Sequence, residues 1–327
     1  MDLAFEIIKQ LSDGKFHSGE VLATRFGVSR AAVWKHLKRI RNEIGLEVHA
    51  VQGRGYRLAR RLELLQEEKI RSFISESGSA RISTLEIHEK IDSTNSYLMS
   101  KAFSGAESGA VCLAEQQTSG RGRRGRQWVS PFGTNVYLSL YWSFPLSPAA
   151  LTGLSIAAGI TVAETLEQMG IQGIALKWPN DVLWNSRKLA GLLLEVSGEH
   201  GGPSRVVLGL GINTLFPPGQ AESIDQPWID LSEIPGGGAI GRNALAGALI
   251  DNLAKQLVVF EQEGMTPFID RWERYDVFTG KPVVLQMGSE MIHGVHRGID
   301  ARGALLLERN DRIDAFHGGE VSLRPRR

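Results

Sequence analysis

The sequence contains very little cysteine. Cys112 is the one cysteine among 327 residues, which excludes an internal disulfide and a cysteine metal cluster. It lies within an apolar run, so we expect a core residue and not a nucleophile. Runs of about 18 apolar residues and a basic stretch ahead of an apolar leader are also missing, so neither a transmembrane helix nor a signal peptide is predicted. These absences predict a cytoplasmic protein.

Acidic and basic residues balance over the whole chain but not within its parts. The formal net charge is +1, with 42% hydrophobic and 22% charged residues, as in ordinary globular proteins. Residues 1–61 hold twelve Lys and Arg against six Asp and Glu, a net charge of +6, which leaves −5 for the remainder. A chain of this length is sufficient for two or three domains. The basic N-terminal part is therefore expected to meet a polyanion.

Two short helices are predicted at the N-terminus. Apolar residues recur at helical spacing over residues 2–14, before an Asp-Gly stop. A second helix is expected to begin after Ser18, which can cap it, and to end at Gly27. The side chains expected on its inward face are Val21, Leu22 and Phe26.

A third helix and a hairpin follow. Ser29 can cap a helix over residues 30–45, and two alternating strands flank Gly53–Gly55. The inward stripe of that helix is Val33, Leu37, Ile40 and Ile44, with Arg41 pointing outward. Together these elements form a winged helix-turn-helix pattern, whose third helix enters the DNA major groove. The residues predicted to contact DNA are Ser29, Arg30, Trp34, Lys35, Lys38, Arg54 and Arg57. A helical domain with a merely solvated basic face is the alternative.

The remaining sequence mixes strands and helices. Residues 59–74 have the pattern of a linker that passes into a helix. Strands are predicted over 135–142 and 205–213, a hairpin around Asn185-Ser186, and long helices over 149–170 and 243–263. After residue 275, short strands separated by glycines predict a small antiparallel β domain with a barrel-like shape. The segment 219–228 has the composition of a plain loop.

Four arginines and three glycines alternate between Ser119 and Trp128. This segment follows an apolar strand in the acidic part of the chain, so DNA is not its expected target. Glycines allow backbone N–H groups to form an anion-binding concavity, and arginines add charge, so we expect an anion on a small molecule. Trp128 can cover a flat group, and no Gly-Lys-Ser/Thr follows, which excludes a Walker loop. The glycines also predict a mobile lid.

Polar residues at three strand ends indicate the rest of the site. The sequence KWPND over residues 177–181 ends a strand with polar groups. GLGIN over 209–213 ends another with an amide, and its two glycines allow a close approach to the backbone. Lys188 enters an otherwise apolar strand. Such a lysine is usually a surface residue, but among polar neighbours it can neutralise developing negative charge.

These motifs, with DSTN over residues 92–95 and in this order, resemble the biotin–protein ligase family. With the N-terminal winged helix, the chain is similar to the bacterial bifunctional members, which combine a biotin–[acetyl-CoA-carboxylase] ligase with a biotin operon repressor. The resemblance covers essentially the whole chain. It implies an α+β multidomain fold: a winged helix-turn-helix domain over 1–64, a mixed α/β catalytic domain over 65–275 and an SH3-like β-barrel over 276–327.

The resemblance also implies a reaction in two steps. Biotin and ATP, as its Mg²⁺ complex, form biotinyl-5′-AMP, and a lysine of the biotin carboxyl carrier protein, an acetyl-CoA carboxylase subunit, then takes the biotin. Operator DNA is the implied second partner, and the adenylate is expected to promote a homodimer. Positioned cations and amides suit this chemistry better than a protein nucleophile.

Carried over residue by residue, the family motifs assign the site. The implied catalytic residues are Lys188, Arg121 and Arg123. The implied biotin-binding residues are Ser93, Thr94, Asn95, Gln117, Gly120, Arg121, Gly122, Arg123, Lys188, Gly191 and Gly209. The implied nucleotide-binding residues are Trp128, Asn180, Asp181 and Asn213, and no protein metal site is implied. Ser93 and Thr94 equally suit a helix N-cap, and Arg124 and Arg126 are expected to point outward.

Two alternatives remain open at this point. A lipoate ligase shares the chemistry, although the glycine–arginine segment favours biotin. A ligand-sensing repressor without enzymatic activity is the other, and the presence of Lys188 argues against it.

Overall fold

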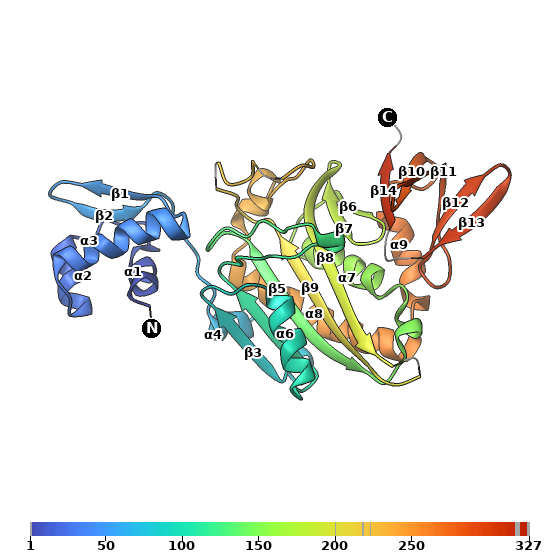
Figure 1. Ribbon diagram of the computed structural model, residues 1–327, viewed down its shortest axis with the longest axis horizontal. Coiled ribbons are helices and arrows are strands. Elements are labelled where there is room, and N and C mark those ends of the chain that lie inside the picture. The colour runs from blue at the N-terminus through green and yellow to red at the C-terminus, as the bar shows by residue number, and fades with distance from the viewer. Residues whose placement is uncertain (1, 200, 218, 223, 318–320, 326–327) are drawn as a thin grey trace.

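The chain is folded into three bodies arranged in a row (Figure 1). This computed structural model describes residues 2–199, 201–217, 219–222, 224–317 and 321–325. The winged helix, in blue, stands at one end, a large sheet flanked by helices fills the middle, and a small β domain, in red, stands at the other end (Figure 1). The architecture agrees with the expected α+β multidomain fold, while the boundaries proposed at residues 64 and 275 stay predictions.

The N-terminal body has the predicted three helices and hairpin. Its elements are α1 (Leu3–Leu11), α2 (Gly19–Phe26), α3 (Arg30–Arg39), which continues as the π-helical turn η1 (Ile40–Ile44), β1 (Val48–Val51) and β2 (Gly55–Leu58). The hydroxyls of Ser18 and Ser29 accept hydrogen bonds from backbone N–H groups of the first turns of α2 and α3. Gly27 ends α2 with a φ of 64°. The predicted caps are thus confirmed.

One part of the predicted core was wrong. Val21 is 56% exposed, whereas Leu22 and Ala23 are buried and Phe26 is half-buried. Neighbouring residues of a helix are separated by about 100° around its axis. Because α2 turns Leu22 and Ala23 toward the other helices, Val21 is left facing solvent.

A mixed sheet forms the middle body. Its strand order is β3-β4-β5-β9-β8-β7-β6, with β3 and β4 parallel and the other neighbours antiparallel. The strands are β3 (Thr84–His88), β4 (Ala110–Ala114), β5 (Val136–Phe144), β6 (Ile174–Lys177), β7 (Asp181–Trp184), β8 (Arg187–Gly198) and β9 (Ser204–Ile212). Asn185 and Ser186 have φ angles of 44° and 62° and form the predicted hairpin turn. Cys112 is buried in β4, as expected of a core residue.

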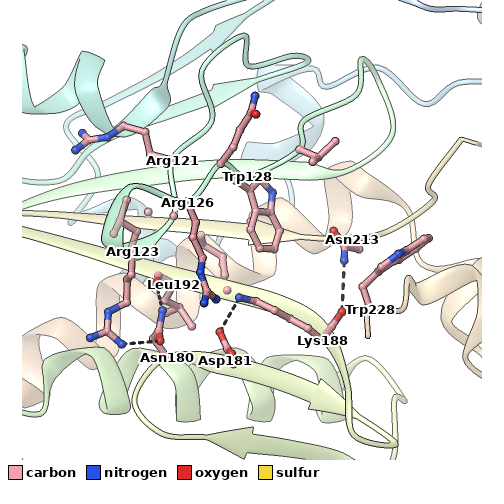
Figure 2. A pocket seen from close by; sticks show the side chains of 18 of the residues that line it. Arg121, Arg123, Arg126, Trp128, Asn180, Asp181, Lys188, Leu192, Asn213 and Trp228 are labelled. Atoms are coloured by element: carbon pink, nitrogen blue, oxygen red, sulfur yellow. Dashed lines mark hydrogen bonds and ion pairs between the residues drawn. The ribbon is translucent and has the colours of Figure 1, made fainter. Parts of the chain in front are cut away.

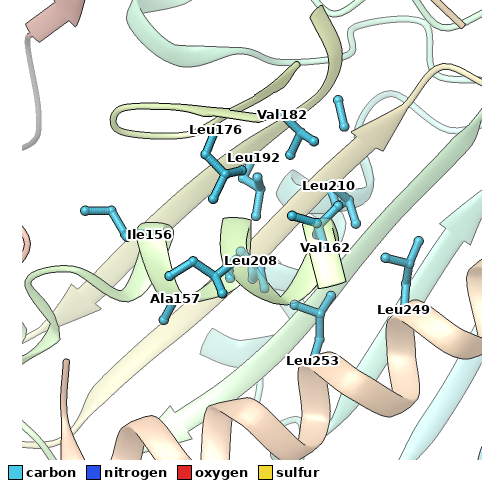
Figure 3. Close-up of a cluster of buried hydrophobic side chains, with 14 of the residues drawn as sticks. Ile156, Ala157, Val162, Leu176, Val182, Leu192, Leu208, Leu210, Leu249 and Leu253 are labelled. Atoms are coloured by element: carbon cyan, nitrogen blue, oxygen red, sulfur yellow. The ribbon is translucent and has the colours of Figure 1, made fainter. Parts of the chain in front are cut away.

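Helices cover both faces of this sheet. The two long helices, α7 (Leu154–Gln168) and α8 (Arg242–Glu263), pack on one face, with α4 (Glu67–Arg71) and α5 (Glu76–Ser79) against α8. Apolar side chains of α7, α8, β8 and β9 interdigitate there (Figure 3). The opposite face carries α6 (Thr94–Phe103), packed on β4, β5 and β9. A cavity opens beside the first turn of α6.

The helix α7 begins later than predicted and is strongly apolar. Gly153, with a φ of 88°, separates it from the short helix η3 (Pro148–Leu151). Among the described residues, Pro148–Gln168 is the one stretch long and apolar enough to cross a membrane, with a mean hydropathy of 1.5. Since 67% of that window is buried inside the fold, it is placed as a core helix.

The C-terminal body is a five-stranded antiparallel sheet with the order β13-β12-β11-β10-β14. The short helices η6 (Thr266–Phe268) and α9 (Ile269–Tyr275) precede β10 (Pro282–Met287), β11 (Glu290–Ile299), β12 (Leu305–Arg309), β13 (Arg312–Phe316) and β14 (Val321–Pro325). Residues 318–320 and 326–327 of the predicted domain lie outside the described residues. The Trp178 indole N–H donates to the Gly303 carbonyl at 3.0 Å, which ties this domain to the KWPND segment.

The linker between the first two bodies is anchored by a buried network. The Arg242 guanidinium lies 2.8 Å from Glu115 and also donates to the carbonyls of Glu63 and Asn135. In turn, the Glu63 carboxylate accepts from the Arg242 backbone N–H at the start of α8. Leu62 is buried in the winged-helix core. The linker is therefore an ordered part of the structure.

Candidate active site

A large cavity of about 280 Å³ opens on the sheet face that carries α6. The first turn of α6, strands β8 and β9, the segment 177–181 and much of the segment 119–128 line it, together with residues 213, 216, 224–226 and 228. Figure 2 shows part of this lining. Its volume lies near the lower limit of small-ligand pockets. The predicted biotin and nucleotide residues therefore come together around one cavity, with Gly120 just behind its wall.

One end of the cavity is lined by neutral polar groups. The Gln117 side-chain oxygen accepts hydrogen bonds from both the backbone N–H and the hydroxyl of Thr94, at 2.9 and 3.1 Å. Ser139, which no sequence motif indicated, has its hydroxyl 2.8 Å from the Thr94 hydroxyl and 2.6 Å from the Asn95 side-chain oxygen, so its one proton can be donated to either. Ser93 caps α6 by accepting from the Ser96 N–H at 3.4 Å. This end can bind a compact, uncharged polar group.

Two glycines of β9 make room for the cavity walls. A Cβ on Gly209 would lie 2.1 Å from the Asn95 side-chain oxygen, and a Cβ on Gly211 would lie 2.4 Å from the Trp128 ring. The close approach expected at the GLGIN glycines is thus confirmed. Asn95 and Trp128 sit directly on the strand backbone because these positions lack side chains.

Residues 119–128, which we call the tongue, form a narrow hairpin. The Gly122 N–H donates to the Arg126 carbonyl at 2.7 Å, and Arg121 pairs with Gln127. The tip is the short helical turn η2 (Arg123–Gly125), where Arg124 adopts a φ of 57°. The tongue thus has a defined hairpin geometry, and the mobility predicted for it stays a prediction.

The four arginines of the tongue point in different directions. Arg123 donates to the Asn180 side-chain oxygen at 3.1 Å, and Asn180 donates to the Leu192 carbonyl at 2.6 Å. Burial lowers the pKa of Arg123, although Asp181 opposes this effect. Arg124 reaches the C-terminal domain, where it donates to the Gln286 carbonyl at 3.2 Å.

Arg126 differs from expectation, whereas the role predicted for Arg121, which lines the cavity, stays a prediction. Figure 2 shows the Arg126 side chain pointing into the cavity, and Arg126 contributes to its lining, although an outward position was predicted. Conversely, Arg121 points away from Lys188 and lies 2.8 Å from the Glu195 carboxylate. The turn at the tongue's tip reverses the chain, which brings Arg126 back over the cavity.

Lys188 lies at the centre of the cavity. Its ammonium is 2.7 Å from the Asp181 carboxylate, whose other oxygen lies 2.9 Å from Lys177. The pairing of β7 with β8 is irregular, because β8 has one extra residue, Leu189, between two paired positions. Such a bulge changes the direction of the adjacent side chain, here that of Lys188. Burial opposes ionisation of Asp181, but the two ammonium groups outweigh it and lower the pKa of that carboxyl.

Aromatic rings form the remaining walls. The Lys188 ammonium lies 5.4 Å from the centre of the Trp128 ring, a cation–π geometry. Trp228 packs on Phe216 with ring centres 4.9 Å apart, and both line the cavity. The segment 219–228, predicted as a plain loop, therefore contributes to the site through Trp228, which its composition did not reveal. Asn213 donates to the Ile229 carbonyl at 3.1 Å and fixes this segment to β9.

Comparison with known proteins agrees with this geometry. Family models match residues 4–57 as an HTH domain, 87–213 as the biotin/lipoate A/B protein ligase family and 278–324 as the biotin protein ligase C-terminal domain. The bifunctional ligase/repressor BirA of Salmonella typhimurium is 45% identical over 97% of this chain and 96% of its own. The chain belongs to the biotin–protein ligase family.

Two further relatives support this assignment. The bifunctional ligase/repressor BirA of Escherichia coli is 43% identical, over 98% of this chain and 96% of its own. Among solved structures, the biotin protein ligase from Aquifex aeolicus in complex with biotin and ATP is 28% identical, with a TM-score of 0.64. That match covers 75% of this chain and 100% of the other.

The winged helix exposes a basic face. Arg30, Trp34, Lys35 and Lys38 are exposed on α3, and the Lys38 ammonium lies 5.7 Å from the Trp34 ring centre. The wing arginines Arg54 and Arg57 stack on Phe16, at 4.3 and 4.9 Å from its ring centre. The Ser29 hydroxyl is already used in capping α3.

Proposed function

We propose that this chain activates biotin with ATP and transfers it to a lysine of a biotin carboxyl carrier protein. The observation that carries the proposal is Lys188, a cation held by buried Asp181 between a neutral polar pocket and a rim of arginines. A carboxylate and a phosphate can meet at such a cation, while the neutral end suits a ureido ring. The family membership supports the same reaction.

The neutral end of the cavity is assigned to the biotin ring. Ser93, Thr94, Asn95 and Gln117 offer hydroxyl and amide groups that match the donors and acceptors of a ureido group. Gly122, Gly191 and Gly209 line this cavity, and a Cβ on Gly191 or Gly209 would lie 3.0 Å from Lys188 or 2.1 Å from Asn95. The assignment of these glycines and of Gly120 to biotin rests on this lack of side chains near the ring. With the ring held at this end, the valeryl chain runs toward Lys188.

The arginine-rich end is assigned to the nucleotide. Arg123 and Arg126 can bind phosphate oxygens, and Trp128 can stack on the flat adenine. Trp228 and Asn213 also line the cavity, beyond Trp128 and across from Arg123 (Figure 2). Asn180 fixes Arg123 by accepting its hydrogen bond.

Magnesium fits this site as part of its substrate. Among the described residues no group of three His, Cys, Asp or Glu side chains forms a metal site, and the carboxylates lining the cavity are Asp181 and Asp225. Mg²⁺ is usually held by one or two carboxylates together with substrate phosphates. The ion would neutralise phosphate charge, and Asp181 is the carboxylate nearest the reacting groups.

The reaction proceeds in two balanced steps. A biotin carboxylate oxygen attacks the α-phosphorus of ATP and pyrophosphate leaves, which gives biotinyl-5′-AMP. An uncharged lysine amine of the carrier then attacks the acyl carbon, AMP leaves and the amine loses its proton. Lys188 holds the carboxylate and α-phosphate oxygens together and neutralises the charge that develops in both steps.

The winged helix gives the chain a second function as a transcriptional repressor that binds operator DNA. Its exposed basic helix supports groove binding. Biotinyl-5′-AMP acts as a corepressor by favouring a homodimer, because two winged helices then meet a palindromic operator. Both functions use partners found in the cytoplasm, which is the proposed location.

Transfer of radiolabelled biotin to a purified carrier domain tests the ligase function. We expect transfer that requires both ATP and biotin and that lipoate does not replace. Lipoate-driven transfer without biotin-driven transfer would contradict the assignment and favour the lipoate ligase. Footprinting tests the repressor, since equal operator affinity with and without biotin and ATP would contradict corepression.

A further inference from the structure

Glu195 lies directly behind the cavity wall. It belongs to β8, is half-buried, and is not among the residues that line the cavity. Its carboxylate nevertheless contacts two residues that do line it. Arg121 lies 2.8 and 3.0 Å from its two oxygens, and the Asn95 amide donates to it at 3.0 Å.

The contact with Asn95 fixes the direction of an amide. The Asn95 nitrogen donates to Glu195 and to the Leu193 carbonyl, while its oxygen accepts from Ser139. An amide can present either end, and only its partners decide which end faces which way. A carboxylate accepts hydrogen bonds and donates none, so Glu195 admits only the nitrogen.

The contact with Arg121 fastens the tongue. Arg121 pairs with Gln127 across the tongue and donates to the Ser96 hydroxyl of α6 at 3.3 Å. Its ion pair with Glu195 therefore joins the tongue to β8 and α6 at the end of the cavity assigned to biotin. Figure 2 shows this arginine directed away from the Lys188 ammonium.

We propose that Glu195 is a positioning residue for biotin, which orients the Asn95 amide and clamps the tongue through Arg121. The proposal rests on the proposed function, because it concerns the biotin end of that site. Glu195 itself touches no substrate. Arg121 is the partner of Glu195 in this ion pair, and Arg123 and Arg126 are left to bind the carboxylate and phosphate groups of the substrates.

The two contacts can be separated by substitution. Arg121→Ala removes the clamp and leaves the Asn95 contact, whereas Glu195→Ala removes both. The double reversal Arg121→Glu with Glu195→Arg restores an ion pair, but an arginine at position 195 cannot accept from the Asn95 amide. Glu195→Gln keeps the shape and one acceptor oxygen. Glu199→Ala, at an exposed position just beyond β8, is the matched control.

The first measurement is the KM for biotin and for ATP in pyrophosphate exchange. Glu195→Ala is expected to raise the KM for biotin roughly 10-fold or more, as for removal of a hydrogen bond to a charged group. The KM for ATP should rise less, because ATP is affected only through the loosened tongue that carries Arg123 and Arg126. Arg121→Ala should raise the KM for biotin less than Glu195→Ala does. The KM for biotin of Glu195→Gln should lie between those of wild type and Glu195→Ala. The double reversal should keep the high KM for biotin, and Glu199→Ala should match wild type.

The second measurement is hydrogen exchange of the Gly122 and Trp128 amides without ligand. Both are hydrogen-bonded within the tongue. Hydrogen exchange of both amides should accelerate in Arg121→Ala and in Glu195→Ala. In the double reversal it should return toward the wild-type rate. Hydrogen exchange does not depend on the proposed reaction. If the wild-type protein showed no biotin-dependent pyrophosphate exchange, the proposed function would be contradicted, but hydrogen exchange would still test the clamp. An unchanged KM for biotin, or unchanged amide exchange, in Glu195→Ala would overturn the proposal.

Discussion

The Lys188 ammonium and the Asp181 carboxylate form an ion pair of 2.7 Å in the wall of the ligand cavity. Lys177 holds the second carboxylate oxygen at 2.9 Å, so one buried anion aligns two cations. A positively charged side chain held in place before the substrate arrives needs no reorganisation when charge develops. The pair therefore links the stability of the fold with the chemistry proposed for it.

Asp181 predicts a defined pH dependence of stability. Burial opposes its ionisation, but Lys188 and Lys177 outweigh that effect and lower its pKa below the ordinary value of 3.8. A lowered folded-state pKa contributes stability above the unfolded-state value, and the contribution is lost as pH falls through the folded-state value. We expect Asp181→Asn to be less stable than wild type at neutral pH, with the gap closing below about pH 4.

Denaturant unfolding at a series of pH values measures that gap. Asp311→Asn, an exposed change in the turn after β12, is the matched control and should leave stability unchanged. A gap that widened as the pH fell would show that the sign of the coupling is wrong.

Gly211 predicts a substitution that disturbs the nucleotide side of the cavity. An alanine Cβ would lie 2.4 Å from the Trp128 ring, so the indole must move. Overpacking of this kind costs about 1–3 kcal/mol, and we expect the KM for ATP to rise in Gly211→Ala. In α7, Gly159→Ala is the control, because its nearest neighbour would lie 3.7 Å away. Equal KM values in the two variants would show that Trp128 is not part of the nucleotide site.

The pair of Arg242 and Glu115 predicts a large loss of stability. Both side chains are buried, and they hold the linker because Arg242 donates to the Glu63 carbonyl and Glu115 accepts from the Leu65 N–H. Arg242→Met leaves Glu115 buried without a countercharge, which costs about 3–5 kcal/mol. Adding Glu115→Gln should recover part of this loss in thermal or urea unfolding. If the single variant unfolded like wild type, the pair would not anchor the linker.

The exposed face of α3 predicts a salt-dependent interaction with DNA. Replacement of Lys35 and Lys38 by alanine should weaken operator binding and reduce the slope of log affinity against log salt by about one for each phosphate that the protein no longer neutralises. Ligase activity should stay at the wild-type value, because both residues lie outside the cavity. Lys281→Ala, exposed in the C-terminal body, is the control. An unchanged slope would exclude these lysines from the interface.

Local features of the fold were predictable from the sequence. Ser18, Ser29 and Gly27 act on the turns next to them, and Asn185-Ser186 closes a hairpin between adjacent strands. Each signal acts within a few residues of the chain, so it requires no knowledge of distant contacts. The same holds for the glycines of GLGIN, whose missing side chains indicated a close approach.

Contacts between distant segments were not predictable. Glu195 reads as one residue of an alternating strand, and its partners Arg121 and Asn95 come from two other elements. The inward direction of Arg126 depends on the turn at the tongue's tip, and the contribution of Trp228 depends on packing against Phe216. Such placements follow from tertiary pairing, which a single sequence does not display.

Biotin-dependent exchange of pyrophosphate into ATP tests the central claim most directly. The wild-type protein should catalyse pyrophosphate exchange in the presence of biotin. In Lys188→Ala the exchange rate should fall on the order of 10²–10³-fold, the usual effect of removing a group that stabilises the transition-state charge. Lys69→Ala, exposed on α4, should match wild type. Exchange that Lys188→Ala catalysed at the wild-type rate, in a protein that remained folded, would contradict the account.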